Sequence, residues 1–112
     1  MSRDNLDSLK HYQVYISSSA EKDLADIGRY IFYELSAPVA AFSMIEAAQK
    51  AIEGLSEMPH RYALVLDERL AAMGYRKIIV KNYIVFFSVD EKEKAVNVER
   101  ILFGRRDWQN LL

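Results

Sequence analysis

The chain has 112 residues, a length that predicts one compact domain and leaves no room for a second. Its hydrophobic share of 51% excludes disorder caused by too little apolar content. The absence of cysteine excludes disulfide scaffolds, thiolate metal sites and cysteine nucleophiles, while a net charge of -1 excludes no class of partner.

The first residues are polar, and we expect residues 1–11 to form an N-terminal extension and residues 12–112 to form the domain. Residues 11–17 alternate, with Tyr12, Val14 and Ile16 on one face, which predicts a half-buried strand. Neither a secretory h-region nor an apolar run long enough to cross a bilayer is found, so we expect a cytoplasmic protein without membrane contact.

Two helices are predicted next, joined by two or three residues into an antiparallel hairpin. Ser18 is expected to cap the first helix, with Glu21 completing a capping box. Its apolar stripe comprises Ala20, Leu24, Ile27, Ile31 and Leu35. Pro38 suits the first turn of the second helix, which we expect to end before Pro59. The second stripe comprises Ala41, Ile45, Ala48, Ile52 and Leu55.

Residues 60–74 are predicted to form a loop with one helical turn near residues 67–72. Three strands follow, at residues 75–80, 83–89 and 95–103. Lys81 and Asn82 form a two-residue connection between the first two, in which we expect Asn82 to take a positive φ.

The order β-α-α-β-β-β predicts an α+β fold in which an antiparallel sheet packs on the helical hairpin. Both faces of the strand at residues 83–89 are apolar, so we expect it to be central and covered on both sides. The last strand changes its apolar phase, and a bulge near Glu99 and Arg100 would account for the change.

Charge is distributed unevenly along the chain. Residues 1–59 carry five Lys and Arg against nine Asp and Glu, whereas residues 60–112 carry ten against seven. The C-terminal half also interleaves its basic side chains with aromatic ones. That pattern is typical of single-stranded nucleic-acid binding, but it fits a packed core with solvated strand ends equally well.

Several chemistries have no support in the sequence. The two histidines, His11 and His60, have no ligand spacing, so no metal is expected. No glycine-rich phosphate loop or nucleophile elbow occurs, and we expect no cofactor. An enzymatic activity would have to depend on Arg, Lys, Tyr, Glu or His60 acting on a polyanion.

Three segments, at residues 74–80, 82–90 and 101–108, carry a resemblance to a known family. Together with Ser19–Leu24 at the start of the first helix, they make residues 12–112 resemble the RelE/ParE superfamily of bacterial toxins, found in type II toxin–antitoxin (plasmid stabilisation) modules. The resemblance implies the β-α-α-β-β-β fold and a cognate antitoxin protein that wraps the toxin and stops growth inhibition. A homodimer or a toxin–antitoxin hetero-oligomer is consistent with it.

The resemblance implies two different activities. RelE-like members cut mRNA on the ribosome, and ParE-like members poison DNA gyrase. Where RelE-like nucleases tend to carry an arginine, directly after the aromatic residue that Tyr83 matches, this chain has Ile84, which cannot stabilise a phosphorane by charge. We therefore favour ParE-like action on gyrase. A ribosome-dependent mRNA endonuclease and a degenerate member that only binds antitoxin remain the alternatives.

The candidate site residues follow from the basic C-terminal half. For an endonuclease, the catalytic candidates are Arg76, Lys77 and Arg106. For contact with the target or the antitoxin, the candidates are Arg69, Arg76, Lys77, Lys81, Tyr83, Arg105, Arg106 and Trp108.

Overall fold

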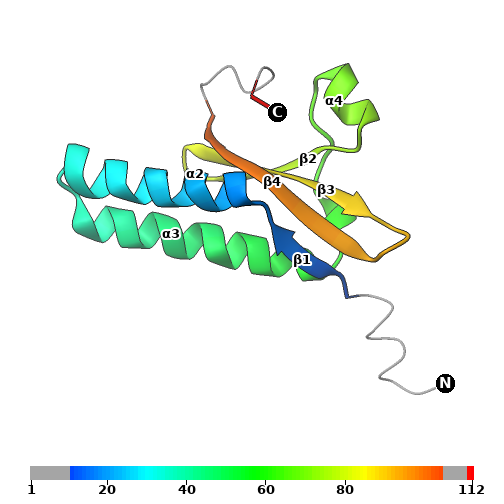
Figure 1. The fold of residues 1–112 in the computed structure, drawn as a ribbon, viewed down its shortest axis with the longest axis horizontal. Helices are drawn as coiled ribbons and strands as arrows, with labels where there is room; N and C mark the ends of the chain where they lie inside the picture. The colour runs from blue at the N-terminus through cyan, green and yellow to red at the C-terminus, as the bar shows by residue number, and fades with distance from the viewer. Residues whose placement is uncertain (1–10, 105–110) are drawn as a thin grey trace.

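A four-stranded sheet and a helical hairpin form the two main layers of the computed structural model, which describes residues 11–104 and 111–112. The strands are β1 (Gln13–Ile16), β2 (Arg76–Val80), β3 (Tyr83–Asp90) and β4 (Ala95–Phe103), and their order in the sheet is β1-β4-β3-β2. Figure 1 shows the hairpin lying along one side of the sheet and extending beyond it. The α+β fold class is confirmed.

The hairpin consists of α2 (Ser18–Arg29), which continues into the π-helical turn η1 (Tyr30–Glu34), and of α3 (Pro38–Glu53). Ser17, not Ser18, caps α2, because its extended backbone lets its Oγ accept a hydrogen bond from the Ala20 N–H at 2.9 Å. The same hydroxyl donates to the carbonyl of Glu99 at 2.7 Å. The cap therefore also ties the start of α2 to β4.

The two helices approach most closely at Gly28. A Cβ at this position would lie 2.7 Å from Cδ1 of Ile45, so only glycine admits the isoleucine where it stands. Ile45 consequently faces α2 and is half-buried, and Met44 takes the core position that the sequence assigned to Ile45. Leu35, also predicted in the core, is 55% exposed because it lies at the end of η1, beyond the sheet.

The sheet is a meander with one parallel edge. β2, β3 and β4 pair antiparallel as predicted, with Val80 opposite Tyr83 and Tyr83 opposite Phe103. β1 pairs with β4 in parallel, from Gln13 opposite Ala95 to Ile16 opposite Val98. The predicted antiparallel sheet is formed by β2, β3 and β4, and β1, to which the sequence assigned no partner, adds one parallel edge where the chain enters α2.

A bulge in β4 confirms the predicted phase change. Phe86 pairs with Arg100 and Phe87 with Val98, so Glu99 is the extra residue. Because of it, Val98 and Ile101 both pack in the cluster beneath the helices, while Leu102 packs on the opposite face.

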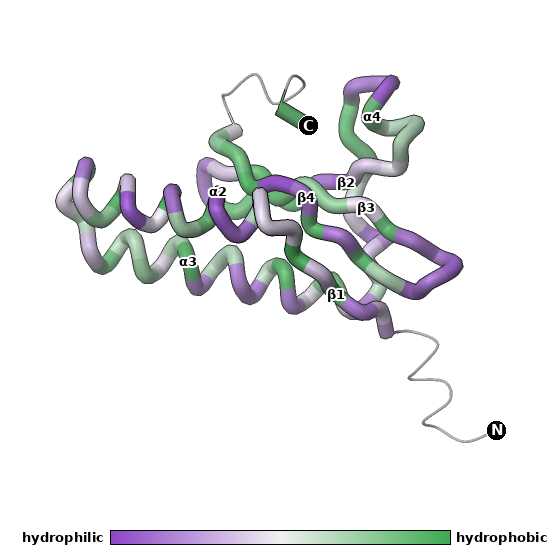
Figure 2. The backbone as a smooth tube through the Cα atoms, in the orientation of Figure 1, coloured by the Kyte–Doolittle hydropathy of each residue, from purple (hydrophilic) through white to green (hydrophobic). Residues whose placement is uncertain are grey.

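Apolar side chains fill both faces of β3, as the sequence predicts. Val85 and Phe87 pack beneath the hairpin. Ile84 and Phe86 pack on the other face, in a smaller cluster covered by Val65, by α4 (Glu68–Ala72) and by Leu111 and Leu112. Figure 2 shows green, hydrophobic stretches on the central strands and on both helices.

The connections complete the fold. Two short 3-10 turns, η2 (Gly54–Ser56) and η3 (Pro59–Arg61), lead from α3 toward the loop before α4. In the β2–β3 turn the positive φ belongs to Lys81, at 56°, and not to Asn82 as predicted. Within the described residues, no helix has the length and apolar content needed to cross a membrane.

Candidate interaction surface

The rings of Tyr83 and Phe103 lie at the point where the sheet ends beneath the hairpin. They are cross-strand partners, and their ring centroids are 5.6 Å apart at an interplanar angle of 70°. Three hollows, of about 370, 850 and 460 Å³, all include both residues in their walls. We call this area, with Tyr30, Val39 and Lys81 around the two rings, the Tyr83 surface.

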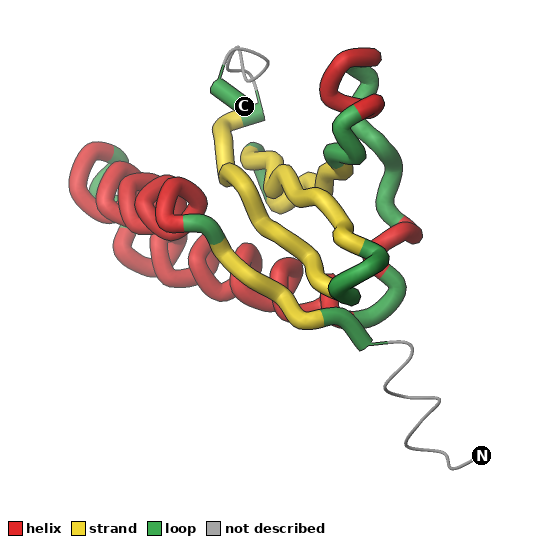
Figure 3. Tube along the Cα trace, turned by 45° about the vertical axis from the view of Figure 1, so that its right-hand side comes forward, coloured by secondary structure: helices red, strands yellow, loops and turns green. Residues whose placement is uncertain are grey.

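The largest hollow exists because the hairpin is longer than the sheet it covers. In Figure 3 the red helices continue past the yellow strands, so the inner side of their far end is left without a sheet beneath it. Tyr30, Leu35 and Val39 line the hollow there and are 50%, 55% and 83% exposed. Large apolar side chains that stay exposed next to a concave wall are typical of a protein-binding surface.

Few charges reach the Tyr83 surface. Residues 35–45, from the end of η1 into α3, contain no charged residue. Lys81 is the basic residue in the walls of two of the hollows, and it is exposed. Burial raises the pKa of the Tyr83 hydroxyl, and nearby Tyr30 raises it further, so this hydroxyl stays neutral.

The two acids in the smallest hollow already have partners. Asp23 accepts hydrogen bonds from Arg100 Nε at 2.7 Å and Nη2 at 2.9 Å, and from the Ile101 N–H at 2.9 Å. Asp26 accepts from Lys22 at 2.7 Å and from Arg29, and these bonds, first that of Lys22, lower the pKa of Asp26. Among the described residues, the surface therefore offers a partner apolar contacts and one cation without an ion-pair partner, Lys81.

The structure separates the predicted site residues into groups. Lys81 and Tyr83 come together at the Tyr83 surface. Arg76 lies at the other end of β2, about 13 Å along the strand from the partner of Tyr83. Arg69 is exposed on α4.

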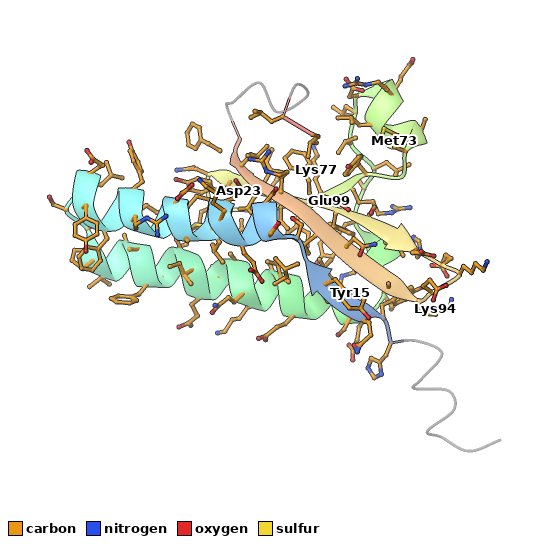
Figure 4. All side chains as sticks on the ribbon, viewed as in Figure 1. Tyr15, Asp23, Met73, Lys77, Lys94 and Glu99 are labelled. Carbon is orange, nitrogen blue, oxygen red and sulfur yellow. The ribbon has the colours of Figure 1, made fainter. Side chains whose placement is uncertain are left out.

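Arg76 and Lys77, the two described catalytic candidates, lie on opposite faces of β2. Nη1 of Arg76 donates to the carbonyl of Tyr62 at 2.6 Å and to that of His60 at 3.4 Å, so it holds the loop before α4. Lys77 belongs to the face that carries α4, as Figure 4 shows. Their side chains therefore leave β2 on opposite sides of the sheet.

Ile84 is 9% exposed and packs in the cluster beneath α4. A charged side chain at this position would have to displace that packing. The remaining predicted residues, Arg105, Arg106 and Trp108, lie outside the described residues, and their roles stay predictions.

A second polar group lies at the opposite end of the sheet, around Glu91. This carboxylate accepts hydrogen bonds from Tyr12 and Lys94, each at 2.6 Å, and pairs with Nε2 of His60. The bonds, that of Lys94 first, lower the pKa of Glu91 to about 2. Glu91 is thus an anion that joins Tyr12, just before β1, to η3 and the β3–β4 turn. Among the described residues, no group of three or more His, Asp or Glu could hold a metal ion.

The contribution of the helices to the Tyr83 surface was missed by the sequence analysis. Tyr30, Leu35 and Val39 were interpreted as parts of helical segments, and none was named as a site residue. One signal was available, because residues 35–45 carry no charge although most of them are exposed in the structure.

Comparison with known proteins places the chain among toxins. The family described as "ParE toxin of type II toxin-antitoxin system, parDE" matches residues 14–108. A comparison of the sequence with curated proteins finds no significant match.

Three solved structures share the fold. The chromosomal ParDE system of P. aeruginosa aligns with a TM-score of 0.68 and 18% identity, over 83% of this chain and 96% of that one. The RelBE2 toxin–antitoxin complex of Mycobacterium tuberculosis aligns with a TM-score of 0.59 and 20% identity, over 84% and 92%. The archaeal RelE–RelB complex of Pyrococcus horikoshii OT3 aligns with a TM-score of 0.56 and 13% identity, over 86% and 98%.

Proposed function

The chain belongs to the ParE toxin family of type II toxin–antitoxin systems, and from this premise we propose that it inhibits growth until a cognate antitoxin binds its Tyr83 surface. The solved structures with the same fold come from toxin–antitoxin systems, which supports an antitoxin as the partner. A homodimer is not needed for this function.

The Tyr83 surface suits a segment that folds as it binds. Its hollows are apolar and open, and such walls accept the alternate or helically spaced side chains of a peptide. Lys81 lies at its edge with no ion-pair partner among the described residues, so the complementary segment carries an Asp or Glu there. This is the chemistry of an acidic, amphipathic antitoxin segment.

We further propose that the toxin acts on DNA gyrase and not as a nuclease. The observation that carries this choice is the separation of Arg76 from Lys77 by the sheet, with Ile84 buried beneath α4. Metal-free RNA cleavage needs charge and acid–base groups that converge on one phosphate. Arg76 and Lys77 do not converge, whereas the exposed apolar walls favour a protein target.

Two assays separate the proposed target from the alternative. Purified toxin is expected to block DNA supercoiling by gyrase in vitro, and induction in cells is expected to leave mRNA uncut in primer extension. Codon-positioned cuts within minutes of induction, with gyrase unaffected, would replace the gyrase proposal with a ribosome-dependent nuclease. If the induced protein does not inhibit growth, both proposed activities are wrong, and the remaining alternative is a degenerate member that only binds antitoxin.

The antitoxin contact is tested by reversing one charge. Lys81→Glu is expected to weaken binding of the adjacent gene's product at least tenfold, because it would oppose an acidic residue of the segment. Lys92→Glu, an equally exposed lysine in the β3–β4 turn, is the matched control and should bind as the wild type does. Equal binding by all three proteins would show that the antitoxin does not use the Tyr83 surface.

A further inference from the structure

A separate apolar groove of about 610 Å³ opens between α2 and α3. Its floor consists of Leu24, Ile45 and Ile52, and the end of β1 closes one side with Ile16, which is 41% exposed. The groove lies on the other flank of α2 from the Tyr83 surface, since Leu24 and Ala25 line the groove while Asp23 and Asp26 line the nearest hollow of that surface.

The groove follows from how the helices pack. At Gly28 the missing side chain lets Ile45 approach α2 closely. Toward β1, the lining of the groove on α2 includes the small side chains of Ala20 and Ala25, which leave space beside Leu24. The groove is therefore a built feature of the hairpin, closed at one end by the Gly28 contact.

Two carboxylates stand on opposite rims, Glu21 on α2 and Glu53 on α3. Both are exposed, and within the described part of the chain neither forms an ion pair, in contrast to Asp23 and Asp26 on the same hairpin. Glu21 lies in the first turn of α2, where the helix dipole favours an acid. Glu53 lies at the last residue of α3, where the dipole disfavours one, so folding of the helix does not account for it.

We propose that this groove binds a second part of the cognate antitoxin, a segment in which one large aliphatic side chain lies between Lys or Arg residues. The inference rests on the proposed function and adds the chemistry of the partner. The aliphatic side chain fills the groove over Leu24, Ile45 and Ile52, and the basic residues pair with Glu21 and Glu53.

The two surfaces carry opposite charges, so each one is complementary to residues of the opposite sign. One antitoxin chain can carry residues of both signs. Lys81 at the Tyr83 surface is complementary to an acidic residue of the partner, whereas Glu21 and Glu53 at the groove are complementary to basic residues. Only α2 separates them. A helix is about 10 Å across, so three or four extended residues span it. An antitoxin that wraps over α2 therefore reaches both surfaces with a segment of alternating charge.

The test compares two pairs of substitutions by titrating the purified product of the adjacent gene. Glu53→Lys, alone and with Glu21→Gln, is expected to weaken binding at least tenfold at low salt, with a smaller loss at 0.5 M NaCl, where charges are screened. The matched control is Glu34→Lys, alone and with Glu46→Gln, on the same hairpin outside the groove. The control should bind as the wild type does, and circular dichroism melts verify that every variant is folded.

A charge swap completes the design. Exchanging the antitoxin's basic residues one at a time for Glu should weaken binding to the wild type and restore it to Glu53→Lys. If the wild type binds and the groove variants bind equally well, the inference is wrong while the proposed function stands. If the wild type does not bind at all, the proposed function itself fails. A toxin that self-associates alone, and becomes monomeric with Glu53→Lys, would make a second copy the occupant and overturn the inference.

Discussion

Replacing Asp23 with alanine is expected to destabilise the domain far more than any other acid-to-alanine change on the hairpin. Asp23 accepts three hydrogen bonds, two from the Arg100 guanidinium and one from the Ile101 backbone. The side chains of Arg100 and Asp23 are only 25% and 13% exposed. Removing the Asp23 carboxylate would leave the partly buried Arg100 guanidinium and the Ile101 backbone N–H without this acceptor.

The magnitude follows from these contacts. Hydrogen bonds to charged groups contribute about 1.5–3 kcal/mol, and an unsatisfied buried donor costs about 1–3 kcal/mol. A fully buried pair would lose about 3–5 kcal/mol. Because the pair is partly exposed, we expect a loss of about 2–4 kcal/mol for Asp23→Ala, or a fall in Tm of about 10–20 °C.

Thermal and urea unfolding followed by circular dichroism measures this loss. Asp26→Ala is the matched control on the same helix, because its partners Lys22 and Arg29 are 76% and 62% exposed, and it should lower stability far less than Asp23→Ala does. If Asp23→Ala loses no more stability than Asp26→Ala, the assignment of Asp23 as the link between α2 and β4 is refuted.

Two further changes test local features. The folded-state pKa of Glu91, about 2 against 4.5 for the free group, means that its contribution to stability is complete above pH 4.5 and is lost as the pH falls toward 2. Glu91→Gln should therefore flatten the pH dependence of the urea midpoint in that window. Gly74→Ala should cost about 1 kcal/mol because its φ is 86°. Gly54→Ala, at a φ of -64°, should be neutral or stabilising, and equal melting temperatures would contradict this reasoning.

The spacing of apolar residues, together with the positions of capping residues, Gly and Pro, was sufficient to predict most of the fold. β4 has the predicted bounds, and the helical turn α4 forms within the predicted residues 67–72. The errors concern choices between neighbours. Ser17 and Ser18 are the same residue type, and only the hydrogen bond from Ser17 to Glu99, which lies 82 residues away, favours the first. Ile45 and Met44 are likewise adjacent, and both are apolar, so the sequence pattern does not decide which of them is buried.

The candidate site was less predictable because it is assembled across the chain. Lys81 and Tyr83 are two residues apart in the sequence, within the half of the chain where basic and aromatic residues alternate, and that pattern was enough to predict them as site residues. Tyr30 and Val39 reach the same surface only because the hairpin is longer than the sheet, which no local pattern reports. The separation of Arg76 from Lys77 could have been predicted, since adjacent residues of a strand point to opposite faces.

The parallel edge has a consequence for how the protein is made. Among the described strands, β1 is synthesised first and its one partner is β4, whose Ala95 pairs with Gln13 across 82 residues of sequence. At about 5–20 residues per second, β1 waits about 4–16 seconds for that partner. Until then the hairpin lacks β4, which contributes Val98 and Ile101 to its core, and the Tyr83 surface lacks Phe103. β1 and both helices of the hairpin are therefore synthesised before the strand that joins β1 to the rest of the sheet.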